Sequence, residues 1–172
     1  MSSQIDARLD PANHDWMTAR ETASVFEALR TAGGEARFVG GAVRNALLGQ
    51  RVTDIDIATT LSPASAMSAL KTASIDTVPT GIEHGTITAI VKGHPFEVTS
   101  LRRDVSTDGR RAIVAFTNDW AEDAARRDFT MNAIYADETG CLFDPTGGIA
   151  DLRAGVVSFV GDPDARIQED YL

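Results

Sequence analysis

The sequence contains a single cysteine, Cys141, among its 172 residues. One thiol excludes an internal disulfide and favours a reducing compartment. No apolar run approaches the roughly 18 residues that a membrane-spanning helix needs. The opening residues, MSSQIDARLDPANHDW, have neither the basic nor the apolar stretch of a signal peptide. We therefore predict a cytoplasmic protein with no membrane partner.

Positive charge is also scarce, with 16 Lys and Arg against 25 Asp and Glu and a net charge of −9. This balance argues against a free-standing nucleic-acid binder, which needs clustered basic side chains. Only Lys71 and Lys92 are lysines, so arginine supplies nearly all of the positive charge. Three arginine pairs stand in sequence, at 102–103, 110–111 and 126–127. The planar guanidinium suits bidentate phosphate binding, although most arginines taken singly are solvated surface residues.

The 43% hydrophobic content predicts one ordinary folded domain. Hydrophobic periodicity and turn residues predict one mixed sheet with helices packed on it. The expected helices cover 15–32, 42–49, 63–73, 121–137 and 163–172. The expected strands cover 35–40, 53–59 and 74–81, with a hairpin over 85–101 that turns at 93–95. Residues 103–121 are expected to form a long loop, and 141–162 a set of short strands and turns.

The stretch TDIDIAT places Asp54 and Asp56 in an expected strand, alternating with Ile55 and Ile57. Side chains at i and i+2 of a strand point to the same face, so the two carboxylates would lie together. Such like charges repel unless a cation lies between them. Mg²⁺ is a hard ion that prefers carboxylate and phosphate oxygens. The alternative is two solvated acids at the end of a strand.

Gly40 and Gly41 stand between the expected strand ARFV and the expected helix AVRNALL. Bare amides at a helix N-terminus favour an anion, and Arg44 in the first turn could add a charged fork. Taken alone, the glycine pair could equally be a tight turn beside an exposed arginine. Together with the acidic pair that follows Arg44, it predicts a site for a triphosphate and a metal ion.

Five motifs occur in an order that resembles the class II branch of the nucleotidyltransferase superfamily, which contains CCA-adding tRNA nucleotidyltransferases and bacterial poly(A) polymerases. The resemblance covers about residues 20–172. The motifs are GGAVRNALLG, TDIDIATT, GIEHGTITAIVKGHPFEVTSLRRD, EDAARRDFTMNAIYAD and DPTGGIADLRAGVVSFVGDPDARIQED.

This resemblance implies an α+β fold, the polymerase-beta-like nucleotidyltransferase head, with a mixed, mostly antiparallel sheet and helices packed against it. It divides the chain into three parts. Residues 1–19 would form an N-terminal extension and the start of the first helix. Residues 20–148 would form the catalytic head, and 149–172 a truncated connection to a neck domain.

The resemblance also assigns site residues. Asp54 and Asp56 would hold Mg²⁺, and the turn at 40–41 with Arg44 would contact the incoming nucleotide. Arg126 and Arg127 would lie near its triphosphate.

A third acid is expected in such a site, and the sequence leaves two candidates open. Glu97 could supply it from a neighbouring strand, or Asp128 could supply it from the RRDFT motif. The alternatives are an exposed strand carboxylate for Glu97 and a helix-capping or arginine-pairing acid for Asp128.

Two departures from the family pattern stand out. Asn45 occupies a position where the family usually has Asp, which removes a charge but keeps an acceptor. Asp170 belongs to an element whose Asp and Arg read the base edge of the nucleotide, and the sequence ends at Leu172, before that Arg. We therefore expect the fragment alone to bind nucleotide and Mg²⁺ weakly, without faithful CCA addition.

The implied activity is template-independent addition of CMP and AMP, from CTP and ATP, to tRNA 3′ ends. The RNA 3′-hydroxyl would attack the α-phosphate and release pyrophosphate, with the RNA held mainly by parts beyond these residues. Poly(A) synthesis is the alternative within the family. A metal-dependent glycosyltransferase and a non-catalytic nucleotide- or RNA-binding module are the alternatives outside it.

Overall fold

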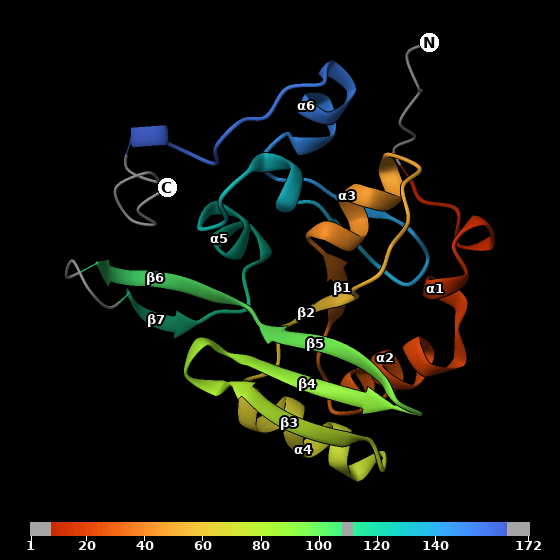
Figure 1. Ribbon diagram of the computed structural model, residues 1–172. Helices are drawn as coiled ribbons and strands as arrows, with labels where there is room; N and C mark the ends of the chain where they lie inside the picture. Colours follow the sequence, from red (N-terminus) through yellow and green to blue (C-terminus); the bar gives the residue numbers. More distant parts are fainter. Residues whose placement is uncertain (1–7, 108–111, 165–172) are drawn as a thin grey trace.

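A seven-stranded sheet forms the centre of the computed structural model, which describes residues 8–107 and 112–164 (Figure 1). Its strand order is β3-β4-β5-β2-β1-β8-β9. The strands are β1 (Ala36–Val39), β2 (Asp56–Thr59), β3 (Asp76–Gly81), β4 (Thr86–Val91), β5 (His94–Ser100), β8 (Tyr135–Ala136) and β9 (Leu142–Phe143). Only β2 and β5 run parallel to each other, and the other neighbouring strands pair antiparallel. The predicted α+β fold with a mixed, mostly antiparallel sheet is confirmed.

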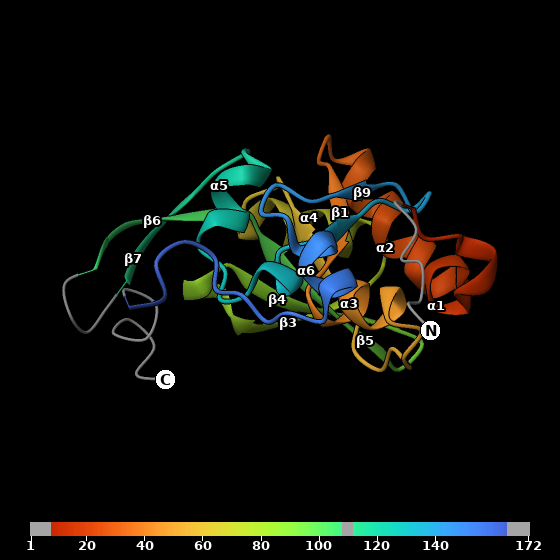
Figure 2. The ribbon, with the colours of Figure 1, turned by 90° about the horizontal axis from the view of Figure 1, so that it is seen from above.

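Helices cover both faces of this sheet (Figure 2). They are α1 (Asp15–Thr18), α2 (Arg20–Thr31), α3 (Gly41–Leu47), α4 (Pro63–Thr72), α5 (Trp120–Ala125) and α6 (Gly148–Ala154). The predicted start of α4 is confirmed, because the Ser62 hydroxyl accepts a hydrogen bond from the Ser65 amide at 3.2 Å and Pro63 opens the helix.

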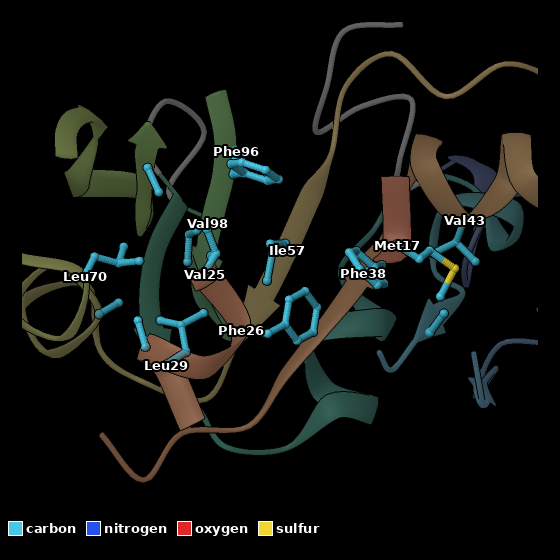
Figure 3. Packing of buried hydrophobic residues seen from close by; sticks show 14 of the residues in the cluster. Met17, Val25, Phe26, Leu29, Phe38, Val43, Ile57, Leu70, Phe96 and Val98 are labelled. Carbon is cyan, nitrogen blue, oxygen red and sulfur yellow. The ribbon is translucent and has the colours of Figure 1, made fainter. Parts of the chain in front are cut away.

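The main core lies between the sheet and helices α2 and α4. Figure 3 shows side chains from these helices and from β1, β2 and β5 gathering in it. Phe38, Ile57 and Val98 contribute from the strands and are at most 1% exposed. A second cluster covers the opposite face, where Trp120 and Ala124 of α5 pack with residues of the sheet. Each central strand therefore buries side chains on both faces.

The hairpin between β4 and β5 turns earlier than predicted. Val91 pairs with His94, so the turn consists of Lys92 and Gly93 alone, with φ of 49° and 80°. Positive φ at both central positions is typical of the type I′ turn, which matches the twist of antiparallel strands. His94 and Pro95 belong to strand β5, and their prediction as turn residues is wrong.

The predicted loop over 103–121 is wrong for most of its length. Strands β6 (Arg102–Thr107) and β7 (Ala112–Phe116) pair antiparallel as a separate two-stranded sheet. They extend away from the main sheet (Figure 1). The segment RRDVST contains one apolar residue, so it lacks the alternation that identifies a half-buried strand.

Three predicted helical or irregular segments also differ. The helix over 15–32 is interrupted at Ala19, whose ψ is 141°. The helix over 121–137 ends at Ala125, and a short 3-10 helix, Thr130–Asn132, follows it. Residues 141–162 include α6, which the sequence analysis missed. The predicted helix over 163–172, with Asp170, lies mostly outside the described residues.

The N-terminal segment packs against the rest of the chain. Arg8 forms an isolated bridge with Cys141, and Leu9 and Met17 are buried in the main core. No helix within the described ranges is both long enough and apolar enough to cross a membrane.

Gly148 provides a test of the packing between α6 and the 3-10 helix. A Cβ at this position would lie 2.1 Å from the Thr130 carbonyl oxygen. Alanine is the better helix former by about 1 kcal/mol, but the clash is with backbone and cannot be relieved by a rotamer change. We expect Gly148→Ala to lower the free energy of unfolding by about 2 kcal/mol or more in urea denaturation.

Gly81→Ala is the matched control, because its Cβ would meet only Thr86 Cβ at 3.7 Å. Its effect should stay below about 1 kcal/mol. Equal stability of Gly148→Ala and the original protein would show that the two helices are not in close contact.

Candidate active site

Four residues form one row across the sheet, and two of them are acidic. Tyr135 of β8 pairs with Val39 of β1, Val39 pairs with Asp56 of β2, and Asp56 pairs with Glu97 of β5. Directly paired residues point to the same face of a sheet. Asp56 and Glu97 therefore lie side by side, on the face that carries the second cluster.

The sequence predicted that Asp54 and Asp56 lie in one strand, and this prediction is wrong. Strand β2 begins at Asp56, and Asp54 lies in a bend before it. The pairing with β5 still extends one residue further, because the Glu97 amide donates to the Ile55 carbonyl at 3.1 Å. Asp54 is exposed, and its carboxylate accepts a hydrogen bond from the Thr53 hydroxyl at 3.0 Å. The neighbour that shares the face of Asp56 is thus Glu97.

The other two acids nevertheless affect Asp56. The pKa of the Asp56 carboxyl is raised to about 6, mainly by burial and then by the negative charge of Glu97, with a smaller contribution from Asp54, while the charge of Arg127 opposes the rise. Like charges gathered in a partly buried place favour protonation or a bound cation. A hard divalent cation suits these oxygen ligands.

Within the described residues, no three His, Cys, Asp or Glu side chains form a complete metal site. This agrees with the way proteins bind Mg²⁺, which usually involves one or two carboxylates together with substrate phosphates and water. The residues present therefore fit a cation that is shared with a nucleotide.

The Gly40–Gly41 turn adjoins the acidic row. Gly40 follows β1 with a φ of +68°, a conformation that favours glycine, and a Cβ here would lie 3.5 Å from Asp56 Oδ2. Helix α3 begins at Gly41 and has seven residues, so its dipole is small. The main feature of the turn is therefore that its backbone, without side chains, lies close to the Asp56 carboxylate.

Arg44 is held by two neutral amide side chains. Its Nε and NH2 groups each donate to Asn45 Oδ1 at 3.1 Å, and NH1 donates to Asn132 Oδ1 at 2.7 Å. Asn45 thus keeps the acceptor role expected where the family usually has Asp. In the part of the chain that the structure describes, Arg44 has no ion-pair partner, so its charge is not neutralised.

Asp128 has a different environment from Glu97. Its carboxylate accepts hydrogen bonds from Asn132 Nδ2 at 3.1 and 3.2 Å and from the Phe129 amide at 2.7 Å. It therefore orients Asn132, which in turn contacts Arg44. Of the two candidate third acids, Glu97 is the one placed beside Asp56 by strand pairing.

Arg126 and Arg127 lie beyond the end of α5, and both bind one carboxylate that the sequence analysis missed. Arg126 donates to Asp123 Oδ1 at 3.1 and 3.0 Å, and Arg127 donates to Oδ2 at 3.2 and 3.0 Å. Asp123 is 1% exposed. Its spacing of three and four residues from the arginines, on a helix, is the signal that could have identified it.

The charge of Asp123 is maintained by its donors. Burial acts to raise its pKa, but Arg127, Arg126, the Tyr135 hydroxyl and the Arg102 amide together hold it below the ordinary value. Arg127 also receives the face of the Tyr135 ring, with its guanidinium carbon 5.3 Å from the ring centroid. Because Tyr135 belongs to the same row as Asp56, Arg127 lies over the acidic end of the sheet.

The raised pKa of Asp56 predicts a pH-dependent cost to folding. An acid whose pKa is higher in the folded state favours folding while protonated, and this advantage is lost as the pH rises from about 4 to about 6. Asp56→Asn should therefore match the original protein near pH 4. At pH 7 it should be more stable by about 1 kcal/mol, since partial exposure reduces the full effect.

Urea denaturation across this pH range measures the difference. Asp76→Asn, at an exposed position in β3, is the matched control and should change stability by less than about 0.5 kcal/mol. A pH-independent difference for Asp56→Asn would contradict the proposed environment of the carboxyl.

Comparison with known proteins identifies the family of the chain. The family described as Poly A polymerase head domain matches residues 36–158, more than half of the chain. The mitochondrial CCA tRNA nucleotidyltransferase 1 of Danio rerio is 49% identical over 139 residues, covering 80% of this chain and 32% of the relative. The CCA-adding enzyme of Anoxybacillus flavithermus is 44% identical over 155 residues, covering 89% and 38%. The chain spans about a third of the length of these curated relatives.

Solved structures agree with the sequence matches. The Bacillus stearothermophilus CCA-adding enzyme in complex with CTP superposes with a TM-score of 0.78 at 38% identity, covering 88% of this chain and 36% of that one. A tRNA nucleotidyltransferase complexed with a primer tRNA and an incoming ATP analog gives a TM-score of 0.62 at 27% identity, covering 80% of this chain and 39% of that one.

The fold, the paired Asp56 and Glu97, the glycine turn and the family match over residues 36–158 lead to one conclusion. The chain belongs to the Poly A polymerase head domain family, the class II nucleotidyltransferases.

Proposed function

We propose that this chain is the catalytic head of a CCA-adding enzyme, which transfers CMP and AMP from CTP and ATP to the 3′ end of tRNA. The observation that carries the proposal is the pairing of Asp56 with Glu97 beside the Gly40–Gly41 turn. The curated relatives named CCA-adding enzyme, and a relative bound to CTP, support the choice of substrates.

Asp54 and Asp56 would hold Mg²⁺ together with the phosphates of the nucleotide, and Glu97, beside Asp56, would be the third acid of the site. When bound, the cation supplies charge neutralisation at phosphate oxygens and polarises them. The pKa of Asp56 is raised mainly by burial and then by the charge of Glu97, and this supports the assignment, because a cation stabilises a partly buried, crowded carboxylate as a proton does. Asp128, which is bonded to Asn132, would act by orienting that side chain.

The other residues would position the triphosphate. Gly40 and Gly41 allow the phosphates to approach the backbone closely, since no side chain stands there. Arg44 keeps its full positive charge between two amides and would contact a phosphate. Arg126 and Arg127, on the side of the site opposite Arg44, would neutralise the charge on the leaving pyrophosphate.

The reaction then requires alignment and electrostatic stabilisation rather than a covalent intermediate. The 3′-oxygen of the RNA forms a bond to the α-phosphorus as the bond to the pyrophosphate oxygen breaks. A carboxylate of the row, that of Asp56 or Glu97, would accept the proton of the 3′-hydroxyl.

Poly(A) synthesis is the second candidate, because the matching family is described as a Poly A polymerase head domain. Both activities need the same head, so the choice follows the curated relatives. Family membership leaves the glycosyltransferase reading without support. The division at residues 19 and 148 and the cytoplasmic compartment stay predictions, and the relatives include mitochondrial as well as bacterial enzymes.

The test is incorporation of labelled nucleotides by the complete protein, with Mg²⁺, onto tRNA that lacks its 3′ end. CTP incorporation followed by ATP supports CCA addition, and long runs of AMP identify a poly(A) polymerase instead. Asp54→Asn and Asp56→Asn should each abolish incorporation, because each removes a ligand charge. Glu97→Gln should reduce the rate about 100-fold or more, and Asp128→Asn should reduce it less.

Asp76→Asn serves as the control and should keep the original rate. Unchanged rates in both Asp54→Asn and Asp56→Asn would refute the metal assignment. A larger loss from Asp128→Asn than from Glu97→Gln would reverse the choice of the third acid.

A further inference from the structure

Asp123 is the most highly bonded side chain in the described part of the site, although it does not belong to the acidic row. It accepts six hydrogen bonds, two of them from the Tyr135 hydroxyl at 2.7 Å and the Arg102 amide at 3.1 Å. Each carboxylate oxygen serves a different arginine, Oδ1 for Arg126 and Oδ2 for Arg127. A buried carboxylate with this many donors has a fixed orientation.

The two arginines are therefore fixed as well. Their side chains are 14% and 17% exposed, and both donate through Nε and NH2, the fork that defines the plane of the guanidinium. Arg127 Nε has a further acceptor in the Tyr135 hydroxyl at 3.1 Å. Two guanidinium charges share one carboxylate, so the group keeps a net positive charge near the acidic row.

The sheet connects this group with the carboxylates. Tyr135 and Asp56 flank Val39 in the same row, so the ring that Arg127 stacks on points to the same face as Asp56. Because Arg127 stacks on Tyr135, its charge lies on the face of the sheet that carries Asp56. Moving Arg127 would therefore alter the charge balance of the site.

We propose that Asp123 is a positioning residue, which holds Arg127 over the acidic row so that its guanidinium meets the phosphates of the nucleotide. This rests on the proposed function. Asp123 itself touches no reacting group. It fixes the plane of the Arg127 guanidinium. It also accepts a hydrogen bond from the backbone amide of Arg102, the first residue of β6, and so links Arg127 to that strand.

A purely structural role is the competing explanation, because removing one partner of a buried ion pair leaves an uncompensated charge and destabilises the fold. The two roles differ in what a charge-balanced variant does. In Asp123→Asn/Arg126→Gln, one positive charge is removed with the negative one, and Arg127 keeps the Tyr135 hydroxyl as a partner. The free energy of unfolding should then be close to that of the original protein. The paired hydrogen bonds from Arg127 to the Asp123 carboxylate, which orient its guanidinium, are still lost.

The first experiment follows the arginine Nε–H signals by ¹H–¹⁵N NMR, without nucleotide. In the original protein the Arg127 Nε–H should exchange slowly with water. In the charge-balanced variant it should exchange at least about tenfold faster, while the folded dispersion of the amide spectrum is kept. Unchanged exchange would show that Asp123 does not fix Arg127, whatever the function of the protein.

The second experiment measures the Kd for CTP with Mg²⁺. Relative to Arg126→Gln alone, the charge-balanced variant should bind CTP about tenfold more weakly. In a background of Arg127→Gln, the Asp123→Asn change should have no further effect on affinity, because the residue through which it acts is gone. Equal affinities of Arg126→Gln and the charge-balanced variant would overturn the proposal.

Glu122→Gln is the matched control, since Glu122 is exposed on the same helix and accepts a hydrogen bond from Thr117. It should change neither exchange nor affinity. Absence of CTP binding by the original protein would refute the proposed function and its dependent claim about phosphates. The exchange measurement would still decide whether Asp123 fixes the arginine.

Discussion

The repulsion between Asp56 and Glu97 is the constraint around which the site is arranged. Strand register fixes the pair, because β2 and β5 run parallel and place the two residues directly opposite each other. Neither carboxylate can move far without breaking the hydrogen bonds between these strands. Two acids in such a place are expected to lower the stability of the folded chain relative to neutral residues, and the proposed binding of a cation would explain why the pair is present.

The pleat of the strands keeps the two repelling carboxylates away from the main hydrophobic core. Ile57 and Val98, the residues next to Asp56 and Glu97, point to the opposite face and are at most 1% exposed. The same strands thus bury apolar side chains against α2 and α4 and present acids on the other side. Fold stability and site chemistry can change independently, because successive side chains of a strand belong to different environments.

Much of this arrangement could be predicted from the sequence, and what could not be predicted has physical reasons. The glycine turn, Arg44 and the acidic pair were identified because local patterns place them at the junctions of elements. Asp54 was assigned to a strand because alternation cannot show where pairing begins. Strand β6 was missed because its segment RRDVST has a single apolar residue and so lacks the alternation that identifies a half-buried strand. The helix predicted over Arg126 and Arg127 follows local propensity, whereas α5 ends at Ala125 in the folded chain.

The two sides of the site hold their arginines in different ways, and the difference has a chemical consequence. Arg44 is oriented by Asn45 and Asn132, whose amides fix its direction without reducing its charge. Arg127 is oriented by Asp123, which also balances part of the positive charge beside it. An acid at position 45 would pair with Arg44 and weaken its attraction for a phosphate. Asparagine at this position therefore leaves the charge of Arg44 unbalanced, while Arg126 and Arg127 share one carboxylate and keep one net positive charge between them. The two sides of the site thus offer similar net charge but differ in how they hold it, Arg44 between neutral amides and Arg127 against a buried carboxylate.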